Sequence, residues 1–356
     1  MHSSDLHAAL GQVWPPFVLV AALLLIGHVA HRGGLFETAA VVLARVPGPP
    51  AVLLVACLAL VALVTAVLNL DTAVVFMTPV LIVTARRRGL AVAPFLYGSV
   101  FMANASSLFL PGSNLTNLLV LHGGGDRSIS GGAFFSRMLS LALPACALTA
   151  VGLLVWHRRA LAAGGARPSA QRAVVGEPEL RAAAVLGCLA AAGVIVVESD
   201  PALPVLCVAL ALLVFGLARR RLGLRASIAR LGLPSLCGLF LLALALGTLA
   251  RAGGFPASLL HGAGRPFTAM LAALSSVVVN NLPAAVLLSA RGHPDASALL
   301  LGLNVGPNLA VTGSLSALLW WRAARSVGAR PSVLAYSRQG VVLSVLAIAG
   351  ALLVAG

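Results

Sequence analysis

One acidic side chain in this sequence lies inside a long apolar run. Asp71 stands within the run 51–84, whereas the other eight of the nine acidic residues lie in or beside polar segments. A carboxylate at membrane depth is costly in free energy and is by default functional, typically as a proton or cation site. We therefore predict that Asp71 carries a coupling proton. The alternative is that Asp71 caps the following half-helix by accepting a hydrogen bond from the amide of Ala73 or Val74.

Four interruptions of apolar segments carry clusters of Asn, Ser and Thr. Where a helix breaks in hydrocarbon, its freed backbone groups must line a cavity or bond to side chains. Half-helix ends also offer dipoles to a solute or an ion. The alternative is that these side chains only form hydrogen bonds with backbone groups freed by the breaks. That alternative is plausible for a single residue but accounts poorly for two matching clusters. The predicted substrate- and ion-binding residues are Asn69, Ser113, Asn114, Thr116 and Asn117 in the first half, and Asn280, Asn281, Asn304, Asn308, Thr312 and Ser314 in the second.

The composition indicates that membrane helices must position these residues. Sixty per cent of the 356 residues are hydrophobic and only 9% are charged, and the mean hydropathy is +1.02. Soluble chains carry about 25% charged residues. Several apolar runs approach the ~20 residues that a helix needs to cross a bilayer. The sequence therefore predicts an all-α polytopic protein of the cell inner membrane.

The two halves of the chain repeat the same order of interruptions. Asn69 corresponds to Asn280, and Ser113 corresponds to the pair Gly313-Ser314. Matching breaks predict two inverted repeats, each with a re-entrant hairpin and a broken transmembrane helix. We predict a first repeat over 1–157 that is short at its N-terminus, a cytoplasmic linker over 158–181, and a second repeat over 182–356. The predicted segments are 14–30, 51–84, 92–121, 133–157, 182–197, 202–218, 232–250, 266–290, 296–320 and 333–354.

The distribution of arginine supports this topology. The net charge is +15, and all 24 basic residues are Arg. With both hairpins re-entrant, nineteen arginines fall on one face, and cytoplasmic faces are enriched in basic residues. A nucleic-acid partner is excluded, because no soluble domain presents a basic surface. The five remaining arginines on the other face are Arg127, Arg137, Arg251, Arg265 and Arg291.

Several short motifs follow one another along the chain: Gly34-Leu35-Phe36-Glu37, Asp71 followed by Thr78-Pro79, Ser113 to Asn117, Asn280 to Pro283, and Gly306-Pro307-Asn308 followed by Gly313-Ser314-Leu315. They resemble the motifs of the bacterial arsenite permeases of the ion transporter superfamily, which is related to divalent-anion/sodium symporters. The resemblance covers nearly the whole chain and implies proton-coupled export of arsenite or antimonite as neutral hydroxides. Two positions depart from the pattern: Leu70 precedes Asp71 where the family usually has Asn, and Asn304 stands where it usually has an acid.

We predict a proton-coupled secondary transporter that exports arsenite as its first candidate substrate. A neutral substrate is favoured because no Arg falls at either break. The alternatives are a proton- or sodium-coupled carrier of a carboxylate or other small anion, and a membrane paralogue that does not transport. An enzyme is not expected, because no nucleophile–base pair or metal-ligand set appears, and no cofactor is expected either.

The expected partners follow from this interpretation. They are a small inorganic or anionic solute, protons or sodium, and membrane lipid. A homodimer is left open. A separate ATPase subunit is left open too, because the chain carries no GxxxxGK[ST] motif of its own.

Overall fold

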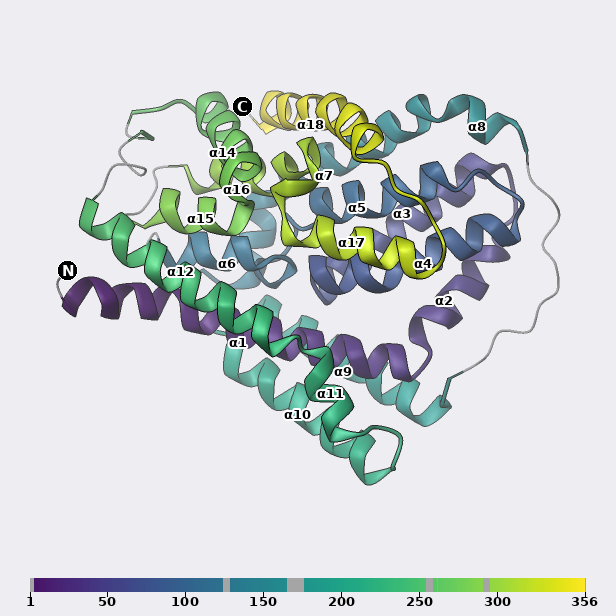
Figure 1. The fold of residues 1–356 in the computed structure, drawn as a ribbon, viewed down its shortest axis with the longest axis horizontal. Helices are drawn as coiled ribbons and strands as arrows, with labels where there is room; N and C mark the ends of the chain where they lie inside the picture. The colour runs from purple at the N-terminus through teal and green to yellow at the C-terminus, as the bar shows by residue number, and fades with distance from the viewer. Residues whose placement is uncertain are drawn as a thin grey trace.

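The computed structural model describes residues 3–123, 129–164, 176–253, 259–260, 262–290 and 295–355, and the described residues are mainly helical, with no strand among them (Figure 1). Six of the described helices are long and apolar enough to cross a membrane. The fold is therefore that of an all-α polytopic membrane protein, as predicted.

The first half contains a long helix, a hairpin, a broken helix and a further long helix. The hairpin is formed by α3 and α4, and the broken helix by α5, the 3-10 turn η1 and α6. The bounds are α1 (Ser3–Arg32), α2 (Leu35–Ala44), α3 (Pro50–Val67), α4 (Leu70–Arg87), α5 (Ala93–Ser106), η1 (Pro111–Ser113), α6 (Leu115–Gly123) and α7 (Gly131–Trp156).

The second half ends with the same succession of hairpin, broken helix and long helix. Here α14 and α15 form the hairpin, and α16 to α17 form the broken helix. The bounds are α8 (Arg158–Ala162), α9 (Pro178–Val197), α10 (Ala202–Ala218), α11 (Leu224–Arg230), α12 (Leu233–Gly253), α14 (Arg265–Val279), α15 (Asn281–Ser289), α16 (Ala296–Val305), η2 (Gly306–Leu309), η3 (Val311–Gly313), α17 (Leu315–Ser326) and α18 (Val333–Ala355).

Three local predictions need correction. The first span begins at Ser3 rather than near residue 14, because the helix continues through polar residues up to Gln12, whose amide is buried and hydrogen-bonded. The segment 158–181, predicted as a loop, starts with the short helix α8 and ends inside α9. The segment 219–230 contains the helix α11, which was not predicted.

The helices form two groups, which we name the core and the frame. The core consists of α3 to α7 and α14 to α18, and the frame of α1, α2 and α9 to α12. Within the core, α4 packs against α17, α15 against α6, and α7 against α18. In the frame, α1 packs along α9, α10 and α12, and these helices lie together along one side of the core (Figure 1). Each hairpin therefore packs on the broken helix of the opposite half.

Both hairpins turn at an asparagine with a positive φ. Asn69 has φ 148° and Asn280 has φ 76°, and asparagine tolerates such values better than most residues. Each side chain then caps the helix that follows: the Asn69 Oδ1 accepts from the Thr72 amide at 2.7 Å, and the Asn280 Oδ1 from the Leu282 amide at 3.4 Å. The two predicted interruptions are therefore equivalent turns.

The long helices α7 and α18 approach closely through two glycines. A Cβ at Gly152 of α7 would lie 2.2 Å from Leu343, and a Cβ at Gly350 of α18 would lie 2.2 Å from Leu148. Each helix thus places a leucine against a glycine of the other. Interior packing at this density has no space for a larger residue.

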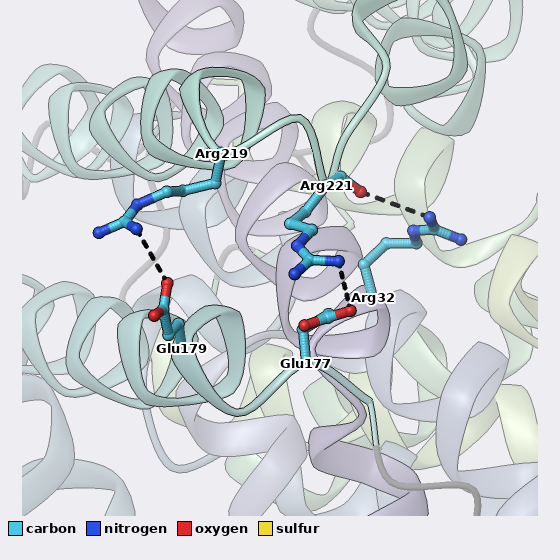
Figure 2. A network of polar contacts seen from close by, with 5 residues as sticks. All are labelled: Arg32, Glu177, Glu179, Arg219 and Arg221. Carbon is cyan, nitrogen blue, oxygen red and sulfur yellow. Dashed lines mark hydrogen bonds and ion pairs between the residues drawn. The ribbon is translucent and has the colours of Figure 1, made fainter.

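Arginines gather where α1 ends, where α4 ends and where α10 joins α11; we name this side the arginine-rich face. Two exposed ion pairs join it to the start of α9: Arg221 with Glu177 at 2.6 Å and Arg219 with Glu179 at 3.2 Å (Figure 2). The Arg32 guanidinium donates to the Arg221 carbonyl at 3.4 Å (Figure 2). Exposed pairs stabilise a fold only slightly, by about 0–1 kcal/mol. These contacts do, however, bring together arginines that were predicted to lie on the same side of the membrane.

Candidate functional site

The predicted coupling residue meets a serine from the opposite half of the chain. Ser316 Oγ donates to Asp71 Oδ1 at 2.5 Å, and Asp71 is half-buried. Asp71 is the second residue after the N-cap of α4, and Ser316 is the second residue after the N-cap of α17. The pair therefore lies between two helix N-termini, whose partial positive charge favours a carboxylate.

The position of Asn69 bears on the alternative role of Asp71. Asn69 provides the side-chain cap of α4, whereas the hydrogen bond of Asp71 goes to Ser316 on another helix. Ser316 was not predicted as a site residue. The repeat contained the signal, because Ser314 and Ser316 are spaced like Asn69 and Asp71.

The second hairpin has no carboxylate at the corresponding place. Leu282 is the second residue after the N-cap of α15, where α4 has Asp71. Thr116 follows Asn114 by two residues, as Ser316 follows Ser314, and the Thr116 amide donates to the Asn114 Oδ1 at 3.1 Å. The two half-sites therefore share their backbone and differ in their charge.

A network of buried amides joins the two breaks. The Asn304 Oδ1 accepts from Ser107 Oγ at 2.6 Å and from Asn114 Nδ2 at 2.7 Å. The Asn304 Nδ2 donates to the Asn117 Oδ1 at 2.7 Å and to the Leu300 carbonyl at 2.8 Å. Every hydrogen-bonding capacity of this amide is used. For Asn304, the geometry therefore fits the alternative role, in which the side chain bonds to other groups of the protein rather than to a solute.

Two further amides of the breaks belong to the same layer. The Asn117 Nδ2 donates to the carbonyls of Ser107 and Leu110, at 2.7 and 3.1 Å. The Asn104 Nδ2 donates to the Asn308 Oδ1 at 2.7 Å. Residues 104 and 308 come from different halves, so this bond also holds the repeats together.

The remaining predicted site residues connect hairpins to breaks or have no hydrogen bond. Ser113 Oγ donates to the Ala66 carbonyl at 3.3 Å, and the Asn280 Nδ2 donates to the Thr312 carbonyl at 3.2 Å. The Thr312 side chain is exposed, and Ser314 Oγ caps α17 through the Ala317 amide. The Asn281 side chain is buried and forms no hydrogen bond with the described residues. The hairpin tips and breaks thus meet, and Asn281 is available to a solute.

Buried polar atoms without partners surround the first hairpin tip. They are Thr65 Oγ1, Asn69 Nδ2 and Thr72 Oγ1, and none of them has a hydrogen bond within the described part of the chain. A buried polar group without a partner costs about 1–3 kcal/mol. A bound solute or ion can satisfy such groups, so Thr65 and Thr72 extend the candidate site beside Asn69.

Inverted hairpins, broken helices and a carboxylate between half-helix ends define a polytopic secondary transporter rather than an enzyme. Residues 5–306 match the CitMHS family, described as citrate transporter, and the chain belongs to this family. A solved structure with a similar fold is that of the YdaH transporter of Alcanivorax borkumensis, described as having an unusual topology. Its TM-score is 0.64 at 14% identity, and the match covers 98% of this chain and 86% of that chain.

The family match changes the expected substrate. Neither comparison supports arsenite or antimonite, and the citrate transporter family favours the alternative of a carboxylate carrier. The general prediction of a membrane transporter is confirmed. The arsenite prediction rested on the resemblance of the motifs, and a neutral substrate was preferred to an anion because the breaks contain no Arg. That preference considered side chains but omitted the helix ends.

Proposed function

We propose that the protein is a secondary transporter of a small carboxylate such as citrate, with Asp71 as the coupling residue. The match of residues 5–306 to the citrate transporter family carries this proposal. Four half-helices, α4, α6, α15 and α17, begin at the joined hairpin tips and breaks. Helix N-termini favour an anion by about 0.3–1 kcal/mol each, and up to about 2 kcal/mol where partly buried. The site can therefore attract a carboxylate without an Arg.

The charge of Asp71 explains why solute and cation would move in the same direction. A carboxylate solute and an ionised Asp71 repel each other, and the repulsion is strong where little water screens it. Protonation of Asp71, or binding of a sodium ion beside it, removes this repulsion. Solute and cation are then carried together, which is symport. We propose protons as the coupling ion, with sodium as the alternative that the experiment separates.

The orientation in the membrane is part of the same proposal. We place the protein in the cell inner membrane with the arginine-rich face in the cytoplasm, because short cytoplasmic loops are enriched in Arg. The repeat boundaries 1–157 and 182–356 and the cytoplasmic linker 158–181 stay predictions, and residues 165–175 of that linker lie outside the described residues. Arg127 and Arg291, which are predicted to lie on the opposite face, lie outside them as well.

Transport of labelled citrate into proteoliposomes tests the proposal. We expect a pH gradient to drive accumulation, and unlabelled citrate, but not arsenite, to compete. Asp71→Asn keeps the size of the side chain but cannot change charge, so it should abolish gradient-driven accumulation while citrate counterflow continues. Leu282→Asn, at the corresponding position of α15, is the matched control and should keep gradient-driven accumulation.

Three results would contradict parts of this proposal. Competition by arsenite without competition by carboxylates would remove the substrate. Accumulation driven by a sodium gradient alone would replace the proton. Intact gradient-driven accumulation in Asp71→Asn would remove the coupling role of Asp71.

A further inference from the structure

A cavity opens between α4 and α17 toward the arginine-rich face. Its volume is about 430 Å³, and its walls come from α4, α17 and the junction of α1 and α2. On α17 the lining residues Leu319, Arg322 and Ser326 recur at helical spacing and so share one face. A space of this size accommodates a small organic anion.

The cavity continues the line of the Asp71–Ser316 pair. Val75 lies one helical turn after Asp71 on α4, and Leu319 lies about one turn after Ser316 on α17; both line the cavity. Residues three or four apart are neighbours on a helix surface. Two apolar side chains therefore separate the cavity from the candidate site.

The positive charge in this cavity has no partner. The Arg322 side chain is exposed, and no carboxylate or carbonyl among the described residues bonds to its guanidinium. The nearest acid in the lining, Glu37, is already paired with His31 Nδ1 at 3.2 Å. Arg86, at the same end of the core, differs because its guanidinium donates to the carbonyls of Val327 and Gly328. Arg322 is thus available to an anion.

Aromatic rings give the cavity a rigid wall opposite α17. The His31 ring stacks on Phe76 at 4.7 Å between centroids, and Phe76 stacks on Phe36 at 4.8 Å. This stack holds the His31–Glu37 pair against α4. The Glu37 carboxylate is therefore held against His31, and among the described residues no carboxylate bonds to Arg322.

The corresponding place at the second hairpin is filled. Gln12 of α1 is fully buried where α15 and α6 meet, and its Nε2 donates to the Leu119 carbonyl at 2.8 Å and to Ser289 Oγ at 3.2 Å. The Arg251 Nη2 donates to the Gln12 Oε1 at 2.7 Å. We name these contacts the Gln12 latch. Access to the site in this structure therefore lies on the arginine-rich side.

We propose that the cavity is a binding site for the carboxylate solute, in which Arg322 binds the anion between the arginine-rich side and the central pair of Asp71 and Ser316. We name it the entry site, because solute added on the arginine-rich side meets it first. This inference rests on the proposed function for the identity of the solute. The planar guanidinium presents two donors in the geometry that a carboxylate accepts. A single binding group at the mouth raises the local solute concentration without replacing the central site.

Thiol labelling of the cavity tests the site without relying on transport. Ser326→Cys is introduced in a full-length chain whose five cysteines are replaced by Ala or Ser, and it is labelled in proteoliposomes. We expect a negatively charged methanethiosulfonate to react several-fold faster than a positively charged one. Citrate should slow the labelling.

Arg322→Gln should remove both effects, and Arg322→Lys should restore the charge preference. Arg325→Gln is the matched control, because Arg325 is exposed on α17 but does not line the cavity. In transport, Arg322→Gln should raise the KM for citrate about tenfold from the arginine-rich side, corresponding to one charged hydrogen-bonding group.

The outcomes separate the entry site from the proposed function. An unchanged charge preference and unchanged citrate protection in Arg322→Gln would overturn the entry site while citrate transport itself stands. An Arg322-dependent charge preference without any effect of citrate or any citrate transport would support an anion site and contradict citrate as the solute. Equal effects of Arg325→Gln and Arg322→Gln would reduce the result to surface charge and overturn the assignment to the cavity.

Discussion

The junction of α4 with α17 and the junction of α15 with α6 are equivalent in the repeat but differ in what fills them. The first holds the Asp71–Ser316 pair and continues into a cavity of about 430 Å³. The second has Leu282 in place of the acid and is sealed by Gln12. Because the backbones correspond, the difference comes from a few side chains and from the position of the frame.

The comparison indicates how access alternates. In an inverted repeat, each half can adopt the conformation that the other half now has. A second state, in which the junction of α15 with α6 is open, is therefore expected beside the one described. That state requires the Gln12 latch to separate and the cavity at Arg322 to close. The frame contacts the core at both junctions, through α2 on α4 and through α12 on α15, so these contacts must rearrange, whereas the Asn304 amide within the core is fully hydrogen-bonded.

The largest expected effect concerns the amide layer, by which we mean the hydrogen-bonded side chains of Asn104, Asn114, Asn117, Asn304 and Asn308 that join the two breaks. Asn304→Ala removes four hydrogen bonds and leaves the Asn114 Nδ2 and the Asn117 Oδ1 without these partners, while Ser107 Oγ keeps its bond to the Asn104 carbonyl. We expect a loss of stability on the order of 3 kcal/mol, since each unsatisfied group costs about 1–3 kcal/mol. Thermal unfolding of the detergent-solubilised protein measures it.

Asn281→Ala is the control for the amide layer. Asn281 has no hydrogen bond within the described residues, so the free energy of unfolding of this variant should change by less than about 1 kcal/mol, while its affinity for citrate falls. Equal unfolding temperatures for the two variants would show that the amide layer does not stabilise the core.

A smaller effect is expected when the open junction loses only its hydroxyl. Ser316→Ala removes the hydrogen bond to Asp71, and bonds to charged groups contribute about 1.5–3 kcal/mol. Gradient-driven citrate uptake should slow by roughly tenfold or more, and Ser316→Thr should restore much of it. Thr116→Ala at the sealed junction should leave uptake near normal. If both alanine variants behave alike, the two junctions are not functionally different.

The smallest effect is expected at the latch. Gln12→Ala removes the bonds to Leu119, Ser289 and Arg251, so the sealed junction should open more often. Ala285→Cys, on the buried face of α15 one turn before Ser289, should then react a few-fold faster with a membrane-impermeant thiol reagent added from the side opposite the arginine-rich face, in a chain whose native cysteines are replaced. Gln339→Ala, which removes the part-buried bond to His157 away from this junction, is the control. An unchanged rate in Gln12→Ala would show that the latch does not close this path.

The sequence indicated the breaks because their signals are local. Asn69, Asn280 and the Pro-Gly and Gly-Pro turns stand inside apolar runs, and each was found from its own neighbours in the chain. Asp71 was found in the same way, from its cost in hydrocarbon.

Pairings across the two halves were not accessible in this way. Ser316 lies 245 residues from Asp71, and Arg251 lies 239 residues from Gln12, so nothing local marks either bond. Asn304 was predicted to bind a solute, and in this structure its amide is fully hydrogen-bonded to its neighbours, an arrangement that its place in the sequence did not indicate. The proposed carboxylate substrate rests on the family match, because a helix end attracts anions without any particular side chain that a sequence would reveal.

The use of arginine alone has a consequence for the proposed coupling to a pH gradient. A guanidinium keeps its charge at every pH that a cell membrane experiences, unlike an amine in an apolar setting. The face that carries Arg32, Arg86, Arg88, Arg219 and Arg221 therefore presents the same attraction to anionic headgroups whatever the pH on either side. Anchoring in the bilayer is thereby insensitive to the gradient, and a titratable residue in the core can respond to it without disturbing the orientation of the chain.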